Sequence, residues 1–183
     1  MKTINELTEE IGINHLNEMQ GAVVKAIQHT NDNIMVLSPT GSGKTLAYIL
    51  PLVCMVDSAS DDLQAIVIVP GRELALQSLN VLRSLGNDVR GYACYGGRPT
   101  MDEHRQLRQL KPHIIFATPG RMNDHIDKDN VDVDSVKWII IDEFDKCLEL
   151  GFHEEMSYLI NRLPFKARQI LLSATPAEEM RHQ

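Results

Sequence analysis

Short apolar runs rich in Val and Ile alternate along the chain with longer amphipathic segments. Segments such as RELALQSLNVLRSLG at 72–86 space their apolar residues with the period of a helix. The apolar runs are continuous, as in strands that are buried on both faces of a parallel sheet. They are IMVL at 34–37, AIVIVP at 65–70, GYACY at 91–95, HIIFAT at 113–118, KWIIID at 137–142 and QILLSAT at 169–175. The pattern predicts an α/β fold with a mostly parallel central sheet and helices on both faces, whose binding residues gather at the carboxyl ends of the strands.

Length and composition predict one globular domain, since 183 residues at 43% hydrophobic can bury a sizeable core. The longest apolar stretch, at 46–56, is shorter than a membrane span and contains Pro51. The first residues lack the basic start and long apolar block of a secretory signal, so we expect a cytoplasmic protein without a membrane contact. Cys54, Cys94 and Cys147 form no CxxC pair, and we expect them to be reduced thiols of the core.

The formal net charge of the chain is −7, which disfavours a polyanionic partner. The molecule as a whole does not attract nucleic acid, so any such contact must come from local arginines and backbone N–H groups.

The stretch SPTGSGKT at 38–45 lies between a predicted strand and a predicted helix, the context that a phosphate-binding loop requires. Gly41 and Gly43 allow the backbone N–H groups to wrap phosphates at the start of the helix. Lys44 would reach the β- and γ-phosphates, and the Thr45 hydroxyl would bind Mg²⁺. The strict phosphate-loop pattern has glycine where this chain has Ser38, so a plain glycine-rich turn is the alternative. The candidate nucleotide-binding residues here are Thr40, Gly41, Ser42, Gly43, Lys44 and Thr45.

A second candidate motif, DEFD at 142–145, ends the apolar run KWIII on two acids. A buried acidic pair costs free energy unless a cation or a polar partner is present. We expect Asp142 to hold Mg²⁺ and Glu143 to orient or deprotonate the attacking water, with Lys44 as the third catalytic group. The alternative is an amino-terminal helix cap, since acids are favoured at helix starts.

With these motifs, the chain resembles the first RecA-like domain of DEAD-box ATP-dependent RNA helicases along nearly its whole length. SPTGSGKT resembles the family's first motif A-x-T-G-S-G-K-T, which accounts for Ser38, and DEFD resembles the DEAD box. PGRELA at 70–75, the glycine doublet at 96–97, TPGR at 118–121 and SAT at 173–175 follow in the family's order. The resemblance implies a RecA-like three-layer fold over 1–183, the cofactors ATP and Mg²⁺, and a second RecA-like domain of the same polypeptide that is absent from this chain.

GINHLNEMQ at 12–20 is similar to the family's Q motif, within an expected Q-motif region at 1–29. Gln20 would then read adenine, because its amide offers one donor and one acceptor. Leu16 and Asn17 stand where the family has proline and threonine, and the aromatic residue upstream of this motif has no counterpart. Gly71 replaces the threonine of P-T-R-E-L-A, and Phe144 replaces the alanine of the DEAD box.

The resemblance also implies a sequence-independent RNA surface formed by loops that follow strands. Its expected residues are Pro70, Arg72, Gly96, Gly97, Arg98, Thr118, Pro119, Gly120 and Arg121, which offer positive charge and backbone N–H groups to phosphates. Each arginine, taken singly, is also explained by solvation or by pairing with a carboxylate. Asp145, Ser173 and Thr175 are the residues that in the family link hydrolysis to RNA.

Two functions of different classes follow from this sequence. The first is an ATPase half of an RNA helicase, which the presence of Lys44, Asp142 and Glu143 favours. The second is a nucleotide-dependent single-stranded RNA-binding module without significant unwinding. A DNA translocase is disfavoured by Gln20 and by the aspartate that ends DEFD. HEEMS at 153–157 lacks the second histidine of a zinc protease helix, and a GxSxG elbow is absent.

Overall fold

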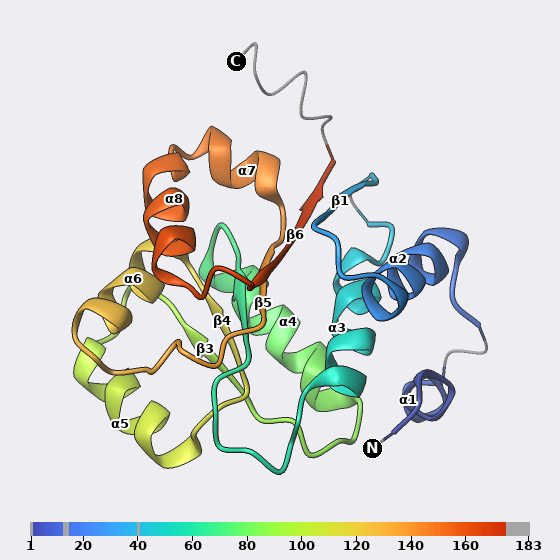
Figure 1. Ribbon diagram of the computed structural model, residues 1–183, viewed down its shortest axis with the longest axis horizontal. Coiled ribbons are helices and arrows are strands. Elements are labelled where there is room, and N and C mark those ends of the chain that lie inside the picture. The colour runs from blue at the N-terminus through green and yellow to red at the C-terminus, as the bar shows by residue number, and fades with distance from the viewer. Residues whose placement is uncertain (1, 13–14, 40, 175–183) are drawn as a thin grey trace.

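A single sheet forms the centre of the molecule in the computed structural model, which describes residues 2–12, 15–39 and 41–174 (Figure 1). Its strands lie in the order β1-β6-β5-β2-β4-β3, and all neighbouring strands are parallel. The predicted α/β class is therefore confirmed, with a wholly parallel sheet in the described residues. The strands are β1 Ile34–Leu37, β2 Ala65–Ile68, β3 Gly91–Cys94, β4 Ile114–Ala117, β5 Trp138–Ile141 and β6 Arg168–Ser173.

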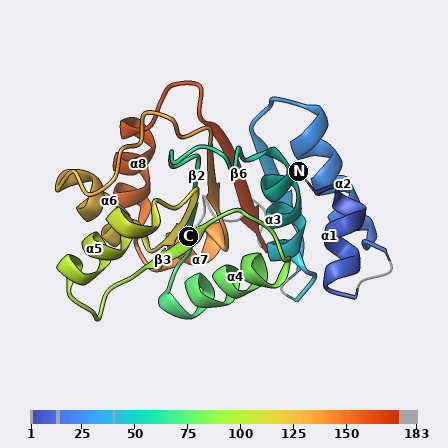
Figure 2. The same ribbon diagram turned by 90° about the horizontal axis from the view of Figure 1, so that it is seen from below.

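Helices cover both faces of this sheet, as the apolar runs predicted (Figures 1 and 2). One hydrophobic core cluster joins the sheet to α1 Ile4–Glu10, α2 Glu18–His29, α3 Lys44–Met55 and α4 Arg72–Ser84. A second core cluster joins the opposite face to α5 Thr100–Leu110, α6 Pro119–Asp127, α7 Phe144–Glu149 and α8 His153–Arg162. The result is the predicted arrangement of three layers.

Strand β2 shows why a continuous apolar run was needed. Successive side chains of a strand point to opposite faces. Ala65 and Val67 belong to the first core cluster, whereas Ile66 and Ile68 belong to the second. All strands run in one direction, so the segments that follow β1, β2, β3, β4, β5 and β6 lie at one edge of the sheet, and these are the segments that carry the predicted motifs.

Arg168, in β6, fixes the end of α2 against the sheet. Its side chain is buried, and its guanidinium donates hydrogen bonds to the carbonyl oxygens of Ile27 at 2.7 Å and Ala26 at 2.9 Å and to Thr30 Oγ1 at 2.9 Å. The last carbonyl groups of a helix receive no hydrogen bond from within the helix. Arg168 therefore fixes the carboxyl end of α2, the helix whose first turn contains Gln20.

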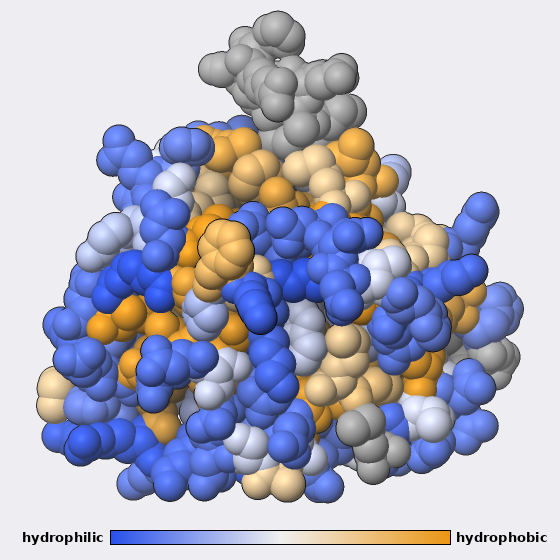
Figure 3. All heavy atoms as spheres, viewed as in Figure 1, coloured by the Kyte–Doolittle hydropathy of each residue, from blue (hydrophilic) through white to orange (hydrophobic). Residues whose placement is uncertain are grey.

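On the face seen in Figure 3 hydrophilic side chains prevail, and hydrophobic side chains gather along the upper edge of the view over α7 and β1. Strand β1 is an edge strand, and Met35 and Leu37 are 39% and 50% exposed. In the described part of the chain, no helix is both long and apolar enough to cross a bilayer.

The cysteines agree with the expectation from sequence. Cys54, Cys94 and Cys147 are free thiols, and all are buried. Burial raises the pKa of Cys54 above its usual value and that of Cys147 to about 12, so these thiols stay protonated. They serve as small core residues.

Candidate functional site

The loop between β1 and α3 has the backbone conformation expected of a phosphate-binding loop. Gly41 and Gly43 have φ angles of 83° and 85°, which residues with a Cβ rarely adopt. Gly43 is also the N-cap of α3, so the helix begins at Lys44. The first N–H groups of a helix have no acceptor within it and favour an anion. Thr40 was also predicted here, and it lies outside the described residues.

Serine side chains support this loop from within. Ser38 Oγ donates a hydrogen bond to Ser42 Oγ at 2.8 Å, and Ser42 Oγ donates to the carbonyl of Pro39 at 2.6 Å. The N–H of Ser38 donates to the carbonyl of Ser173 at 3.0 Å, so the loop also continues the β1–β6 pairing. Glycine at position 38 would lack the first of these bonds. Ser38 is therefore a structural part of the loop.

Helix α2 contacts the same loop through its first turn. Asn17 and Gln20 form a capping box, in which Asn17 Oδ1 accepts from the Gln20 N–H and Gln20 Oε1 accepts from the Asn17 N–H. Asn17 Nδ2 donates to the carbonyl of Ser42 at 3.0 Å, and Gln20 Nε2 donates to the carbonyl of Gly43 at 3.2 Å. The contact is close, because a Cβ on Gly43 would lie 2.4 Å from Gln20 Nε2. The Gln20 amide keeps one N–H and one lone pair for a further partner.

The predicted acidic pair lies opposite the loop, at the end of β5. Asp142 is 3% exposed, and its Oδ2 accepts from Thr45 Oγ1 at 3.4 Å while its Oδ1 accepts from the Glu143 N–H at 2.9 Å. Burial raises the pKa of Asp142 to about 6, and the charge of Glu143 adds to this, whereas the Glu143 N–H, Lys44 and Thr45 lower it. An acid under this penalty gains most from a cation.

Glu143 occupies the N-cap position of α7, yet its side chain makes no capping hydrogen bond. The alternative of a helix cap is therefore wrong for Glu143. Its φ of 50° is unusual for a residue with a side chain, and such strained residues cluster at functional sites. Phe144, the next residue, packs against the second core cluster. The phenylalanine that replaces the family's alanine is therefore accommodated by the hydrophobic core.

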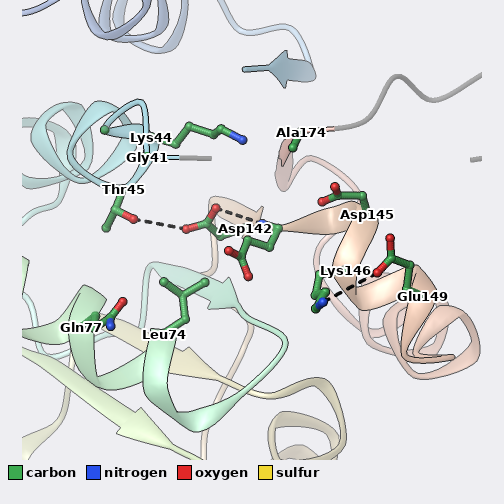
Figure 4. Close-up of a pocket in the computed structure, with 12 residues that line it drawn as sticks. Gly41, Lys44, Thr45, Leu74, Gln77, Asp142, Asp145, Lys146, Glu149 and Ala174 are labelled. Carbon is green, nitrogen blue, oxygen red and sulfur yellow. Dashed lines mark hydrogen bonds and ion pairs between the residues drawn. The ribbon is translucent and has the colours of Figure 1, made fainter. Parts of the chain in front are cut away.

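A pocket of about 560 Å³ brings these groups together. Figure 4 shows Lys44, Thr45 and Asp142 around one hollow, with Leu74 and Gln77 from α4 and Asp145, Lys146 and Glu149 from α7. Predicted residues that line it are Gly41, Gly43, Lys44, Thr45, Asp142, Glu143 and Asp145. The prediction missed five residues that line the pocket: Leu74, Gln77, Lys146, Glu149 and Ala174. Leu74 and Gln77 are three residues apart in α4, and Lys146 and Glu149 are three residues apart in α7, so each pair lies on one face of its helix.

The candidate nucleic-acid residues follow β2, β3 and β4, which are neighbours in the sheet. Arg72 is exposed at the start of α4, and its guanidinium lies over the Tyr95 ring at 5.9 Å. Arg98 lies over the same ring at 4.2 Å. A Cβ on Gly97 would lie 4.0 Å from the Arg72 guanidinium. The structure thus brings PGRELA and the glycine doublet into contact.

Other predicted residues of this surface differ in exposure. Gly96, Gly97 and Gly120 are exposed, Pro70 and Thr118 are half-buried, and Pro119 is buried at the first turn of α6. Gly71 is the N-cap of α4 and has no side chain for a cap bond, so the amino terminus of that helix lacks this hydrogen bond.

Arg121 is largely buried, with a side chain that is 12% exposed. It donates to Thr100 Oγ1 at 2.8 Å and to the carbonyl of Arg98 at 2.9 Å. Arg98 and Arg121 both pair with Glu103, at 2.8 and 3.3 Å. The alternative of carboxylate pairing therefore describes these two arginines in the structure. Glu103 was not predicted, because no feature of α5 distinguishes it from its neighbours.

The proposed coupling residues are only partly described. Ser173 is buried at the end of β6, and Asp145 lies in the first turn of α7 and lines the pocket. Thr175 lies outside the described residues. A hydrogen bond from the SAT segment to Asp145 stays a prediction.

Residues 17–182 match the family model described as DEAD/DEAH box helicase. The chain is 41% identical over 146 residues to an ATP-dependent RNA helicase CshA of Limosilactobacillus reuteri, covering 78% of this chain and 29% of that protein. It is 35% identical over 179 residues to the DEAD-box ATP-dependent RNA helicase CshA of Bacillus subtilis, covering 96% of this chain and 35% of that protein. The chain thus spans about a third of the length of these curated relatives.

Solved structures show the same fold. The crystal structure of a DEAD box protein from Methanococcus jannaschii matches with a TM-score of 0.91 and 29% identity, over 100% of this chain and 50% of that chain. The crystal structure of a hypothetical ATP-dependent RNA helicase from Sulfolobus tokodaii matches with a TM-score of 0.85 and 30% identity, over 98% of this chain and 52% of that chain.

Proposed function

Because the chain belongs to the DEAD/DEAH box helicase family, we propose that residues 1–183 form RecA-like domain 1, the ATP-binding and ATP-hydrolysing half of an RNA helicase. The protein would couple ATP hydrolysis to RNA unwinding or remodelling, together with a second RecA-like domain of the same polypeptide. One observation carries this proposal: Lys44 and Thr45 line one pocket with Asp142 and Glu143. The buried free thiols agree with a cytoplasmic location.

The pocket fits a magnesium nucleotide. The backbone from Gly41 to Thr45 and the Lys44 ammonium would hold the phosphates, and Thr45 and Asp142 would hold Mg²⁺, whose preference for oxygen ligands they meet. Bound Mg²⁺ would neutralise charge on the phosphates. Glu143, in the same pocket, would orient the attacking water and accept its proton.

Gln20 would recognise adenine with the N–H and the lone pair that its contacts with Asn17 and Gly43 leave over. The same bonds link base recognition to the phosphate loop. A side chain held on two sides is also preorganised for its ligand, since it loses little rotamer entropy on binding.

Gln20→Ala should reduce the preference for adenine over guanine nucleotide more than it reduces affinity for the diphosphate. Losing a bidentate base contact costs about 1–3 kcal/mol. Calorimetric titration of the wild-type and variant proteins with ADP and GDP checks this. Lys25→Ala is the control, because Lys25 is exposed on the same helix and its removal should leave both nucleotide affinities unchanged. A Gln20 variant with an unchanged ADP-to-GDP ratio refutes the adenine role.

RNA would bind across the segments after β2, β3 and β4, where Arg72 is exposed and Gly96, Gly97 and Gly120 offer accessible backbone. Contacts of this kind bind phosphate without reading sequence. The net charge of −7 makes such local groups necessary.

Arg72→Ala should weaken binding of unrelated single-stranded RNAs to a similar degree. The slope of log affinity against log salt concentration should become less negative by about one unit. Fluorescence anisotropy of labelled oligouridylate and oligoadenylate across a salt series measures both effects. Arg105→Ala is the control, since Arg105 is exposed on the second face in an ion pair with Asp102. A loss confined to one RNA sequence, or no loss, argues against phosphate binding by Arg72.

The alternative function, a nucleotide-dependent single-stranded RNA-binding module without significant unwinding, is not favoured. Such a module would use Thr45 and Asp142 to bind the nucleotide, but it gives no role to Glu143 in the same pocket. RNA-stimulated phosphate release by the full-length protein separates the two functions.

A further inference from the structure

Glu103 is a fully buried acid on a helix whose sequence is mainly polar. Its side chain has no exposed surface, although α5 reads TMDEHRQLRQL and its neighbour Asp102 is 61% exposed. A buried carboxylate is costly unless each oxygen is satisfied. The surroundings of Glu103 therefore indicate what it is for.

Four donors surround its carboxylate. Oε1 accepts from His125 Nε2 at 2.8 Å and pairs with an Arg121 guanidinium nitrogen at 3.3 Å. Oε2 accepts from Arg98 Nε at 2.8 Å and from the Tyr95 N–H at 3.0 Å. Burial alone would raise the pKa of Glu103, but the hydrogen bonds from His125, Arg98 and Tyr95 outweigh it and hold the pKa below its usual value. Glu103 is ionised and fully paired.

The protonation of His125 follows from its second contact. Asn130 Nδ2 lies 2.9 Å from His125 Nδ1, and an amide nitrogen can only donate. Nδ1 therefore accepts, and Nε2 carries the proton that is donated to Glu103.

A metal site is the competing explanation, because ligand atoms of Cys94, Glu103 and His125 lie within 4.8 Å of one another. The chemistry opposes it. Burial and the charge of Glu103 raise the pKa of Cys94 far above its usual value, so a metal ion would also have to displace a tightly held thiol proton. Two arginines already pair with Glu103, and their charges repel a further cation. The cluster is an ion network centred on a carboxylate.

This network joins the loops that follow β3 and β4. Arg98 comes directly after the glycine doublet, and Arg121 belongs to TPGR at the start of α6. Arg121 also donates to the carbonyl of Arg98, and Arg98 lies over the Tyr95 ring that Arg72 contacts as well. One buried carboxylate thus holds two loops directly and reaches the third through Tyr95.

We propose that Glu103 is a positioning residue for RNA, which holds Arg98 and Arg121 so that the glycine doublet and TPGR segments present their backbone N–H groups on one surface. The inference rests on the proposed function. Arg121 then acts from within the protein, and Arg72 and the exposed glycines contact the phosphates. Two arginines against one carboxylate leave a net positive charge beneath this surface, which favours a polyanion.

Glu103→Gln is the informative substitution, since it keeps the shape and removes the charge. A glutamine amide has one acceptor oxygen and one donor nitrogen, so it cannot accept from all four donors. Its NH₂ group would face an arginine or the His125 N–H, and the two loops would lose their common partner.

The experiment compares wild-type and Glu103→Gln full-length proteins for binding of labelled oligouridylate by anisotropy and of fluorescent ADP. We expect RNA affinity to fall about tenfold, within the range for a buried residue that acts on a ligand without contacting it, and ADP affinity to stay unchanged. Asp102→Asn, the same change one residue earlier on an exposed acid, should leave both affinities unchanged.

A double-mutant cycle with Arg121→Ala separates positioning from general stability. Because Glu103 acts through Arg121 as well as through Arg98, the double variant should lose less RNA affinity than the sum of the two single losses. Unchanged RNA affinity in Glu103→Gln, a parallel fall in RNA and ADP affinity, or fully additive losses would each overturn the inference. If the wild-type protein does not bind oligouridylate, the proposed function fails and this inference with it.

Discussion

Replacing Glu143 with glutamine should lower steady-state phosphate release from ATP by about 10²–10⁴-fold, the usual contribution of a general base. Glu143 lines the pocket beside Lys44 and Asp142, and its backbone is held by the bond from its N–H to Asp142 Oδ1. Glutamine has the same shape, so the loop and its φ of 50° should persist. It cannot accept a proton from water. Nucleotide affinity, measured with fluorescent ADP, should stay close to that of the wild type.

Glu149→Gln provides the matched control for this prediction. Glu149 is an acid of the same pocket on the same helix, but it is exposed and lies 3.8 Å from Lys146 Nζ in an ion pair. Exposed ion pairs of this type contribute little to stability, so the substitution should leave the fold intact. If both substitutions slow turnover equally, the pocket responds to lost charge rather than to a lost base. A fully active Glu143 variant would show that another group activates the water.

The sheet could be predicted from the chain because the strands are short apolar runs with no polar interruption. AIVI in β2 is buried on both faces, and such a run between helical segments is typical of a parallel sheet covered by helices. The strand order could not be predicted in the same way. It depends on which helix crosses which face, and β1 pairs with β6, from the other end of the chain.

The nucleotide pocket could be predicted because its groups belong to two short segments, SPTGSGKT and DEFD, each with an internal pattern. Gln77 and Glu149 were not predicted because they face the pocket only through the rotation of α4 and α7 about their axes, which tertiary packing sets.

Glu103 shows the limit more sharply. Asp102 and Glu103 are adjacent acids in the first turn of α5, and local sequence treats them alike. Asp102 is solvated, whereas Glu103 is enclosed by donors from α6 and from the loop between β3 and α5. What distinguishes the two acids is a set of contacts with other segments, which the sequence of α5 does not reveal.

The polypeptide of residues 1–183, tested alone, should hydrolyse ATP about 10³–10⁵-fold more slowly than a protein in which a second RecA-like domain follows it. In the described residues, the cations that line the pocket are Lys44 and Lys146, and no arginine lines it. Arginines that reach the γ-phosphate supply a rate factor of this size, or about 4–7 kcal/mol. The resemblance implies that they come from the second domain.

The same comparison should include single-stranded RNA, since RNA would favour the closed arrangement of two domains and so raise turnover only when both are present. Phosphate release with and without oligouridylate, for residues 1–183, for the two-domain protein and for its Glu143→Gln variant, measures both effects. Residues 1–183 should still bind ADP, because the phosphate loop, Thr45 and Asp142 all belong to this chain. Retained binding without turnover would place the missing rate in groups outside this polypeptide. Fast, RNA-stimulated turnover by residues 1–183 alone would mean that Lys44 or Lys146 suffices at the γ-phosphate, and the two-domain mechanism would then be wrong for this protein.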